Sequence, residues 1–323
     1  PRQCWTTFYW SRYLSYYQLG YGARGIGTRD SSQDVLALMA SGAEQAKGLI
    51  IKLLSIQRRD GSSYHQFNPL TLVASEGDSL EREDRPHYYS DDHLWGILAV
   101  TDYIKETGDF AFLKMQVPFY DKDKQEKPIE TATVLEHMKR GLEFTSRHTG
   151  AHGLPLLGFA DWNDTVNLPT GAESLFTANL YGHALGSMMI LMDELGEGNV
   201  ASDYWDEYEA MQAIVEEDGW DGAWYRRYFD ADGTPLGSKE NKYGQIYLNA
   251  QSWAVISCFC SYERGLQAMD SVYERLNTEF GIKLSAPGFN GFDPKVGGIT
   301  TYPPGAKENG GIRFVEEVQS FVW

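Results

Sequence analysis

Apolar residues recur at helical spacing along most of the chain. Between residues 33 and 57 they follow one another every three or four positions, and Ser31, Ser32 and Asp34 form a helix-start signal at this point. This pattern predicts a long amphipathic helix. The same spacing, interrupted each time by Gly, Pro, Asp or Trp, predicts further helices at about residues 93–107, 133–147, 173–195, 201–216, 249–260 and 262–277.

Alternating apolar and polar residues, which predict strands, are confined to short pieces at residues 225–229 and 298–302. Residues 122–127 and 230–242 are polar and contain glycine, as is typical of surface loops. The predicted class is therefore all-α with small hairpins, and a chain of 323 residues can enclose one large core. Successive helices with polar loops between them favour a toroid of helix pairs, although an irregular bundle would give the same pattern.

The chain is strongly acidic, with a formal net charge of −17. A surface of this sign repels nucleic acid and anionic membranes, so neither is an expected partner. No apolar run is long enough to span a bilayer, and the first ten residues do not resemble a signal peptide. The missing initiator Met indicates that the natural N-terminus lies elsewhere.

The cysteines bear on the cellular compartment. Cys4, Cys258 and Cys260 are an odd number and have no CxxC spacing. They predict neither a disulfide framework nor a zinc site. A reducing, cytoplasmic compartment fits this usage best.

The densest cluster of reactive side chains is Gly-Phe-Ala-Asp-Trp-Asn-Asp-Thr, residues 158–165. Such a loop can place a carboxyl group against a sugar oxygen while the indole of Trp162 stacks on the sugar ring, which suits glycosyl transfer. The nine Trp and twenty Tyr of the chain fit a sugar-binding protein as well as a large helical core. The alternative is structural: Asp161 and Asn163 satisfy backbone groups of a turn, and Trp162 is buried.

A second cluster, residues 24–34, precedes the first long helix and reads Arg-Gly-Ile-Gly-Thr-Arg-Asp-Ser-Ser-Gln-Asp. Its glycines allow a close approach to the backbone, and Arg24, Arg29 and Asp30 offer two cations and an acceptor for sugar hydroxyl groups. The GxG pattern does not open a βαβ unit, so a dinucleotide site is not indicated. Capping by the two serines and the second aspartate is expected alongside this binding role.

A third cluster, residues 88–95, reads Tyr-Tyr-Ser-Asp-Asp-His-Leu-Trp. Ser90 can cap the following helix, and the helix dipole favours Asp91 and Asp92 in its first turn, so capping is the leading interpretation. A metal site at His93 is rejected because no matching ligand cluster stands out elsewhere.

Near the end of the chain, residues 301–311 form a fourth cluster, Thr-Tyr-Pro-Pro-Gly-Ala-Lys-Glu-Asn-Gly-Gly. The prolines predict a rigid turn, which a charged pair and a flexible Gly-Gly follow. Lys307 and Glu308 of this segment can bind a second sugar or an anion. By itself this is a weak motif.

Together, five segments resemble in order and spacing the cellobiose and chitobiose phosphorylases, the inverting enzymes of glycoside hydrolase family 94. They run from Trp10 to Gly311 and comprise residues 10–34, 88–113, 152–182, 249–257 and 302–311. The resemblance implies an (α/α)6 barrel. It also implies phosphorolysis of a β-linked disaccharide of the chitobiose or cellobiose type, with inversion to an α-sugar 1-phosphate and release of a free sugar.

The resemblance also assigns roles to individual residues. The last carboxyl group of the family's Trp-Asn-Asp motif is its general acid, which falls on Asp164 here. The other assigned positions are Arg24, Asp30 and Trp162 at the non-reducing sugar, Lys307 and Glu308 near the reducing-end sugar, and Gln251 near the phosphate.

This chemistry needs no cofactor, because inorganic phosphate is itself the nucleophile and co-substrate. An inverting hydrolase needs a base about 6.5–9.5 Å from its acid to activate water, whereas a phosphorylase does not. Its one acid must be protonated near neutral pH, and burial against Trp162 beside Asp161 is expected to raise the pKa of Asp164. Cationic groups must hold phosphate on the opposite face of the anomeric carbon.

After Gly311 the sequence departs from the family pattern, which continues to a His that contacts phosphate and later to a Thr-Gly pair. We therefore expect a partial barrel domain at residues 1–311 and an atypical, frameshifted tail at residues 312–323. The family's N-terminal β-sandwich is also absent, and a homodimer is an option for the full-length parent only.

Two other functions stay open from the sequence. An inverting glycosidase would need a second carboxylate as base, and Asp30 and Glu308 are the candidates. A non-catalytic sugar-binding remnant would keep Arg24, Asp30 and Trp162 without a complete phosphate site.

Overall fold

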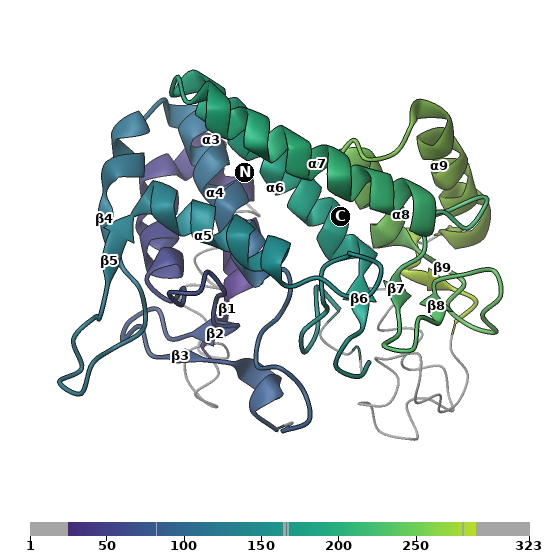
Figure 1. The fold of residues 1–323 in the computed structure, drawn as a ribbon, viewed down its shortest axis with the longest axis horizontal. Helices are drawn as coiled ribbons and strands as arrows, with labels where there is room; N and C mark the ends of the chain where they lie inside the picture. The colour runs from purple at the N-terminus through teal and green to yellow at the C-terminus, as the bar shows by residue number, and fades with distance from the viewer. Residues whose placement is uncertain (1–24, 82, 164–165, 167, 280, 289–323) are drawn as a thin grey trace. The chain divides into compact units, whose positions relative to one another are not determined.

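The computed structural model describes residues 25–288 except 82, 164–165, 167 and 280 (Figure 1). The chain divides into two compact units, residues 1–147 and 148–323, and each is described by itself. Within the described residues helices are present at all seven predicted positions, although the predicted single helix at 33–57 is broken at Gly42, and the strands are only two or three residues long. The predicted helix-rich class is therefore confirmed. The predicted strand at residues 298–302 and the predicted tail at 312–323 lie outside the described residues.

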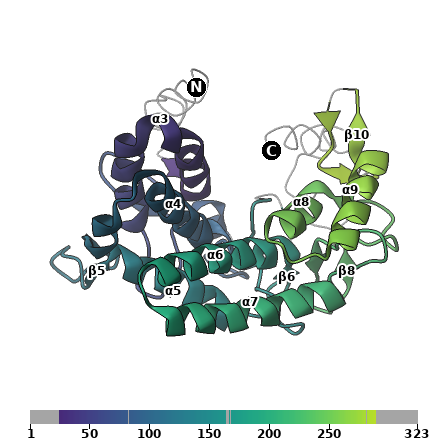
Figure 2. The ribbon, with the colours of Figure 1, turned by 90° about the horizontal axis from the view of Figure 1, so that it is seen from above.

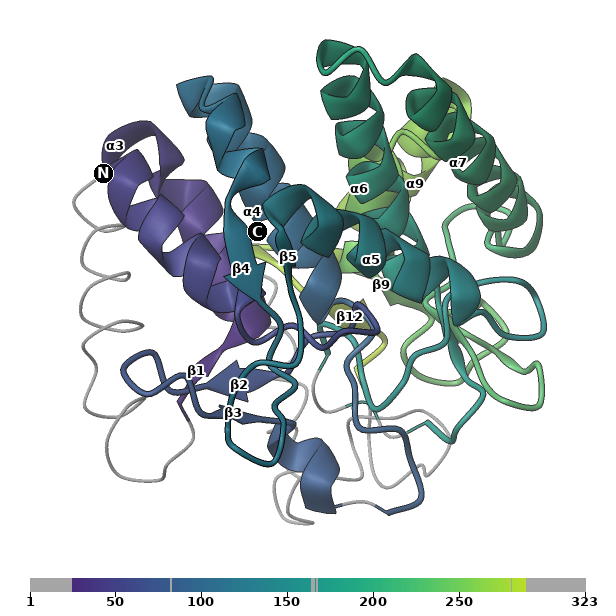
Figure 3. The same cartoon turned by 60° about the vertical axis from the view of Figure 1, so that its left-hand side comes forward.

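The described part of the first unit contains three numbered α-helices, and the first of them is two helical segments joined at Gly42, where φ of −154° and ψ of 41° are not helical. Its elements in chain order are β1 (Ile26–Gly27), α3 (Thr28–Leu54), β2 (Gln66–Phe67), β3 (Ala74–Ser75), the 3-10 helix η2 (Gly77–Glu81), α4 (Asp92–Thr107), η3 (Phe110–Lys114), β4 (Gln116–Pro118), β5 (Thr131–Thr133) and α5 (Val134–Arg147). Strands β1, β2 and β3 form an antiparallel sheet at the start of α3 (Figure 3). The predicted loop at residues 122–127 connects β4 to β5.

Helix α3 starts earlier than its sequence predicts. The backbone N–H of Thr28 donates to the carbonyl of His65, so the β1–β2 pairing leads directly into the helix. Gly27 is the N-cap and provides no side-chain cap. The serines therefore lie inside the first turns, where the Ser32 hydroxyl donates to the Thr28 carbonyl at 2.8 Å. The prediction that Ser31, Ser32 and Asp34 cap this helix is wrong.

Helices α3 and α4 pack against each other (Figure 3), and α3 turns at Gly42, so that Leu53 and Leu54 near its end line the same small cavity as Thr28 at its start. Arg29 at the start of α3 bonds to Asp91 at the start of α4, and Lys47 further along α3 bonds to Asp109, just beyond the end of α4. Both helices thus begin at the same end of the unit. This places the second and third sequence clusters next to each other.

The second unit contains four helices and small strand pairs. Its elements are β6 (Glu173–Ser174), α6 (Leu175–Glu194), α7 (Gly198–Asp218), β7 (Tyr228–Phe229), β8 (Pro235–Leu236), β9 (Ile246–Tyr247), α8 (Leu248–Ile256), α9 (Tyr262–Leu276), β10 (Asn277–Thr278), β11 (Gly281–Ile282) and β12 (Ser285–Ala286). Strands β6, β7 and β8 form an antiparallel sheet, with Ser174 opposite Tyr228. The predicted loop at residues 230–242 includes β8. The predicted helix 249–260 ends at Ile256, because Cys258 adopts a left-handed conformation with φ of 60°.

Helices that are enclosed on nearly all sides alternate with helices that are buried on one face. α4, α6 and α8 bury most of their side chains, whereas α7 buries only Ala201, Tyr208, Met211 and Val215, and α5 and α9 also keep one face exposed. α6 and α7 pack alongside each other (Figure 2). Such alternation is expected of the inner and outer helices of a helical toroid. Closure into a barrel stays a prediction.

Among the described residues, none of the helices combines the length and the apolar character that crossing a bilayer requires.

Two glycines on α6 allow a matched test of core packing. A Cβ on Gly182 would lie 2.1 Å from the ring of the fully buried Phe259, whereas a Cβ on Gly186 would meet nothing within 4 Å. Gly182→Ala is expected to lower the free energy of unfolding by about 1–3 kcal/mol through overpacking. Gly186→Ala is expected to raise it by up to about 1 kcal/mol through helix propensity. Urea unfolding followed by circular dichroism measures both, and equal effects of the two changes would contradict this packing.

Candidate functional site

The structure describes three of the seven site residues that the sequence predicts. Asp30 lies in the first unit, and Trp162 and Gln251 lie in the second. Arg24, Asp164, Lys307 and Glu308 lie outside the described residues. The site is therefore built from the two segments that flank the predicted sugar and acid positions, each within its own unit.

In the second unit, Asp161 is the centre of a fully enclosed polar cluster. Both of its oxygens bind the guanidinium group of Arg227, with Nη1 2.5 Å from Oδ2 and Nη2 2.8 Å from Oδ1. The side chains of Asp161 and Arg227 are 0% and 1% exposed. This is a bidentate ion pair, the geometry in which Arg binds carboxylate most strongly. We call these two residues and Ser174 the Asp161 clamp.

Three further donors complete the hydrogen bonding of the Asp161 carboxylate. The Ser174 hydroxyl donates to Oδ2 at 2.6 Å, the Asn163 amide N–H donates to Oδ1 at 3.0 Å, and the Tyr228 hydroxyl donates to Oδ1 at 3.3 Å. Ser174 also accepts a bond from the N–H of Thr177 and so caps α6. The clamp thus ties the loop at residues 158–163 to α6 and to strand β7.

The charge state of the clamp follows from these contacts. Burial alone would raise the pKa of Asp161, but the charge of Arg227 and the hydrogen bonds from Arg227, Ser174 and Asn163 outweigh it and hold this pKa below its ordinary value of 3.8. Burial likewise raises the pKa of Tyr228 well above 10.0, which keeps its hydroxyl a neutral donor. Asp161 is therefore a permanent anion near neutral pH, and it is unsuited to donating a proton.

Gln251, at the predicted phosphate position, is fully buried and its amide group is engaged by backbone. Its oxygen accepts from the N–H of Tyr225 at 2.7 Å, and its nitrogen donates to the carbonyls of Tyr225 at 2.7 Å and Tyr247 at 3.0 Å. Both amide hydrogens are thus used. In this conformation the side chain holds two backbone segments together and has no hydrogen left for an anion.

Two tyrosines connect Gln251 with the Asp161 clamp. The rings of Tyr228 and Tyr247 meet edge to face, with centroids 6.4 Å apart. The Tyr228 hydroxyl reaches Asp161, and the Tyr247 carbonyl accepts from Gln251. The half-buried Trp162 directly follows the clamped carboxylate. The second unit therefore brings the predicted acid loop and the start of α8 into one packed cluster.

In the first unit, Arg29 and Asp91 form a second enclosed pair. The Arg29 Nε and Nη2 atoms donate to the two oxygens of Asp91 at 2.7 and 3.1 Å, and the Trp95 indole donates to Asp91 Oδ2 at 2.9 Å. Asp91 is the N-cap residue of α4, but its side chain makes no capping bond. The prediction that Ser90 caps α4 is wrong, because the N-cap residue is Asp91, whose carboxylate is bonded to Arg29 and Trp95. Arg29, one of the two arginines in the second sequence cluster, therefore has a structural role in joining α3 to α4.

Asp30 and the glycines before it lie at the same end of α3. A Cβ on Gly27 would lie 2.9 Å from Asp30 Oδ2, so the glycine leaves room for this carboxyl group. Gly25 has φ of 75°, and a Cβ there would lie 2.3 Å from the carbonyl oxygen of Phe67. The backbone at Gly25 is thus approached closely by strand β2, whereas the close approach of a sugar at these glycines stays a prediction. Asp30 itself is half-buried.

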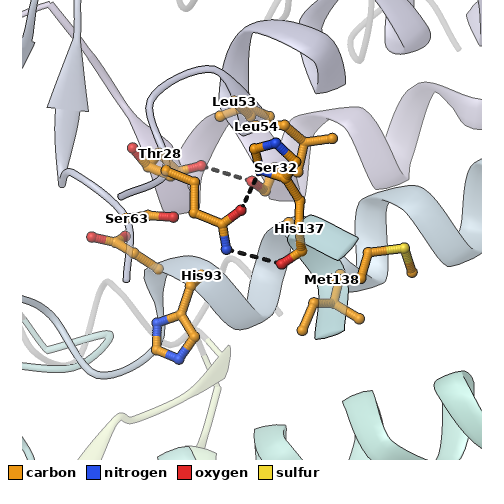
Figure 4. Close-up of a pocket in the computed structure, with 12 residues that line it drawn as sticks. Thr28, Ser32, Leu53, Leu54, Ser63, His93, His137 and Met138 are labelled. Atoms are coloured by element: carbon orange, nitrogen blue, oxygen red, sulfur yellow. Dashed lines mark hydrogen bonds between the residues drawn. The ribbon is translucent and has the colours of Figure 1, made fainter. Parts of the chain in front are cut away.

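A small cavity lies beneath this end of α3 and α4 (Figure 4). The space open to the centre of a water molecule is only about 10 Å³, which holds about one water. Thr28, Ser32, Ser63 and Asp92 are among its polar lining residues. It is too small for a sugar. Within the described residues, no group of three or more His, Cys, Asp and Glu side chains is arranged to hold a metal ion.

Asp92, the first residue of α4, is hydrogen-bonded to the His65 ring. Its Oδ2 atom lies 3.0 Å from His65 Nδ1, and the His65 ring stacks on Tyr89 with centroids 3.6 Å apart. Asp92 is fully buried in the first turn of α4, as its sequence position predicts. The third cluster therefore contributes two buried carboxylates that organise the helix start.

The sequence pattern does not single out Arg227, Ser174 or His65. Arg227 lies in a run, Trp-Tyr-Arg-Arg-Tyr-Phe, whose alternation indicates only a strand. Alternation does offer a signal for it: a charged residue at an inward-facing position of a short strand needs a buried partner. Ser174 follows Glu173 at the start of a helix, and its capping role could have been predicted from that position.

The buried Arg29–Asp91 pair can be tested against an exposed pair in the same unit. Arg29→Met leaves the Asp91 charge buried without its counter-ion and is expected to lower the free energy of unfolding by about 3–5 kcal/mol. Lys105→Met removes a pair with Asp102 in which the side chains are 50% and 43% exposed, and should cost at most about 1 kcal/mol. Denaturant titration measures both. Adding Asp91→Asn to Arg29→Met should recover part of the loss, and equal costs for the Arg29 and Lys105 changes would contradict the pair's importance.

The fold and these clusters define a helix-rich domain whose candidate site residues lie in a polar loop and near the starts of helices. Among solved structures, a sugar epimerase from a ruminal bacterium has a similar fold, with a TM-score of 0.54 at 14% identity over 89% of this chain and 70% of that one. This similarity concerns the fold alone.

The chain belongs to the glycosyl hydrolase 94 superfamily, whose catalytic domain it matches over residues 2–321. Similar proteins include the N,N'-diacetylchitobiose phosphorylase of Vibrio proteolyticus, 33% identical over 96% of this chain and 40% of the relative. The solabiose phosphorylase of Paenibacillus borealis is 34% identical over 89% of this chain and 35% of the relative. The resemblance inferred from the motifs is confirmed. The chain spans well under half the length of these relatives.

Proposed function

We propose that this chain is the catalytic domain of an inverting disaccharide phosphorylase. The full-length protein would cleave a β-linked disaccharide of the chitobiose or cellobiose type with inorganic phosphate and release an α-sugar 1-phosphate and a free sugar. The observation that carries the proposal is the similarity to phosphorylases, about one third identical across nearly all of this chain. A homodimer and a cytoplasmic location remain predictions.

In this mechanism Asp164 is the general acid. A phosphate oxygen attacks the anomeric carbon from the face opposite the leaving sugar, and the bond from that carbon to the glycosidic oxygen breaks. The electron pair goes to this oxygen, which takes the proton of Asp164. Solvent then reprotonates the carboxylate. Phosphate is the only co-substrate, and no cofactor enters the reaction.

The Asp161 clamp changes which interaction we expect to raise the pKa of Asp164. Asp161 was expected to raise the pKa of Asp164 by like-charge repulsion. Because Asp161 is paired with Arg227, the pair carries no net charge, and most of that repulsion is cancelled. Burial against Trp162 is then the main cause that we propose for a raised pKa at Asp164.

The remaining roles are divided among sugar and phosphate contacts. Arg24 and Asp30 bind the non-reducing sugar, and Trp162 lines its ring. Lys307 and Glu308 approach the reducing-end sugar. For Gln251 we propose a narrower role, because its amide is bonded to the backbone of Tyr225 and Tyr247: it supports the phosphate side of the site and reaches phosphate only if these bonds open.

The test of the proposed acid is Asp164→Asn in the full-length protein. Turnover of N,N'-diacetylchitobiose or cellobiose with phosphate should fall by about 10²-fold to 10⁴-fold or more, the usual contribution of a general acid. Release of sugar 1-phosphate measures it. The matched control is Asp203→Asn, which removes an exposed carboxylate from α7 and should leave turnover unchanged.

Near wild-type phosphorolysis by the Asp164→Asn variant would remove this residue from the role. Titration calorimetry on the unaltered protein distinguishes a phosphorylase from a non-catalytic sugar-binding protein. Disaccharide binding without turnover, and without any effect of phosphate on affinity, would contradict the proposal and identify a sugar-binding protein.

A further inference from the structure

Arg227 and Asp161 are 66 positions apart in sequence, yet each fixes the orientation of the other. Two hydrogen bonds from one planar guanidinium group to both carboxylate oxygens hold the carboxylate against rotation. A single-point cation such as Lys cannot do this. The pair therefore fixes the orientation of the Asp161 carboxylate in addition to neutralising its charge.

The orientation passes from Asp161 into the loop that follows it. Its Oδ1 atom accepts the N–H of Asn163, two residues ahead, at 3.0 Å. This bond closes an Asx turn around Trp162, and a rotation of the carboxylate would break it. The conformation of the turn therefore depends on the position of Arg227.

The backbone of Arg227 is hydrogen-bonded to two other segments of the second unit. The Arg227 N–H donates to Leu236 on β8, and its carbonyl accepts from Leu175 at the start of α6, at 2.8 and 3.2 Å. A Cβ on Gly237 would lie 2.6 Å from the Arg227 nitrogen, so the neighbouring strand packs directly on this backbone. Ser174 joins the same carboxylate to the first turn of α6. Arg227 is thus held by backbone on both sides.

We propose that Arg227 is a positioning residue: through Asp161 it fixes the turn that carries Trp162 and leads into the acid of the reaction. This inference rests on the proposed phosphorylase function. A buried ion pair that only stabilises the fold would make the same contacts with Arg227, but its loss would not alter the turnover of molecules that remain folded.

The experiment compares two adjacent arginines in the full-length protein. Arg227→Lys keeps the charge and removes the bidentate contact. Arg226→Lys is the control, because Arg226 is bonded to Asp218 and Asp221 and has no contact with Asp161. Turnover is measured per folded molecule, below the temperature at which either variant begins to unfold, with disaccharide and phosphate varied separately.

For Arg227→Lys we expect kcat to fall about 10-fold to 100-fold, as small misplacements of reacting groups do, while the KM for phosphate changes less than about threefold. Arg226→Lys should keep kcat within about twofold. Asp161→Asn should lower kcat similarly, and the double variant should be no slower than the slower single variant, since both changes disturb one contact. Should Arg227→Lys not fold, Ser174→Ala removes one donor from the same carboxylate and should lower kcat several-fold.

A kcat within about twofold of wild type for folded Arg227→Lys, or additive losses in the double variant, would overturn the positioning role. Absence of phosphorolysis in the unaltered protein would instead overturn the proposed function. The two failures are therefore distinguishable in one set of assays.

Discussion

The buried ion pair between Asp161 and Arg227 is the interaction on which the second unit's site depends. Neither charge can leave water without the other, and the pair lies where the loop at residues 158–163, strand β7 and the start of α6 meet. In the pair the carboxylate has donors on both oxygens, and one of these oxygens also accepts the Asn163 N–H that closes the turn around Trp162. Removing either charge would leave the other buried and unmatched.

The first unit uses the same device at a different place. Arg29 and Asp91 join the starts of α3 and α4, and the Trp95 indole also donates to Asp91. In both units the carboxylate of an aspartate from a sequence cluster, Asp91 or Asp161, is bonded to a buried arginine. Asp30, which follows Arg29 in the first unit, and Trp162, which follows Asp161 in the second, are both half-buried. Arg29, Asp91 and Asp161, which the sequence placed in candidate clusters, thus have structural roles.

Sequence periodicity predicted the helices well because burial on one face repeats every three to four residues and is a local property. It failed at Ser31 and Ser32, since the start of α3 is set by pairing with β2, a contact from a distant segment. It also could not identify Arg227, whose partner lies 66 positions away. Asp161 was one of two acids in the densest sequence cluster, with a turn role as the structural alternative, and its environment supports the turn. The prediction for Asp164 rests on the family resemblance rather than on local pattern.

The central claim is that phosphate, rather than water, is the nucleophile. The most direct measurement is nuclear magnetic resonance of the cleavage products of the full-length protein, with and without inorganic phosphate. The account predicts an α-sugar 1-phosphate when phosphate is present and no cleavage when it is absent. Release of two free sugars at the same rate without phosphate would contradict it and would indicate an inverting hydrolase with a second carboxylate as base.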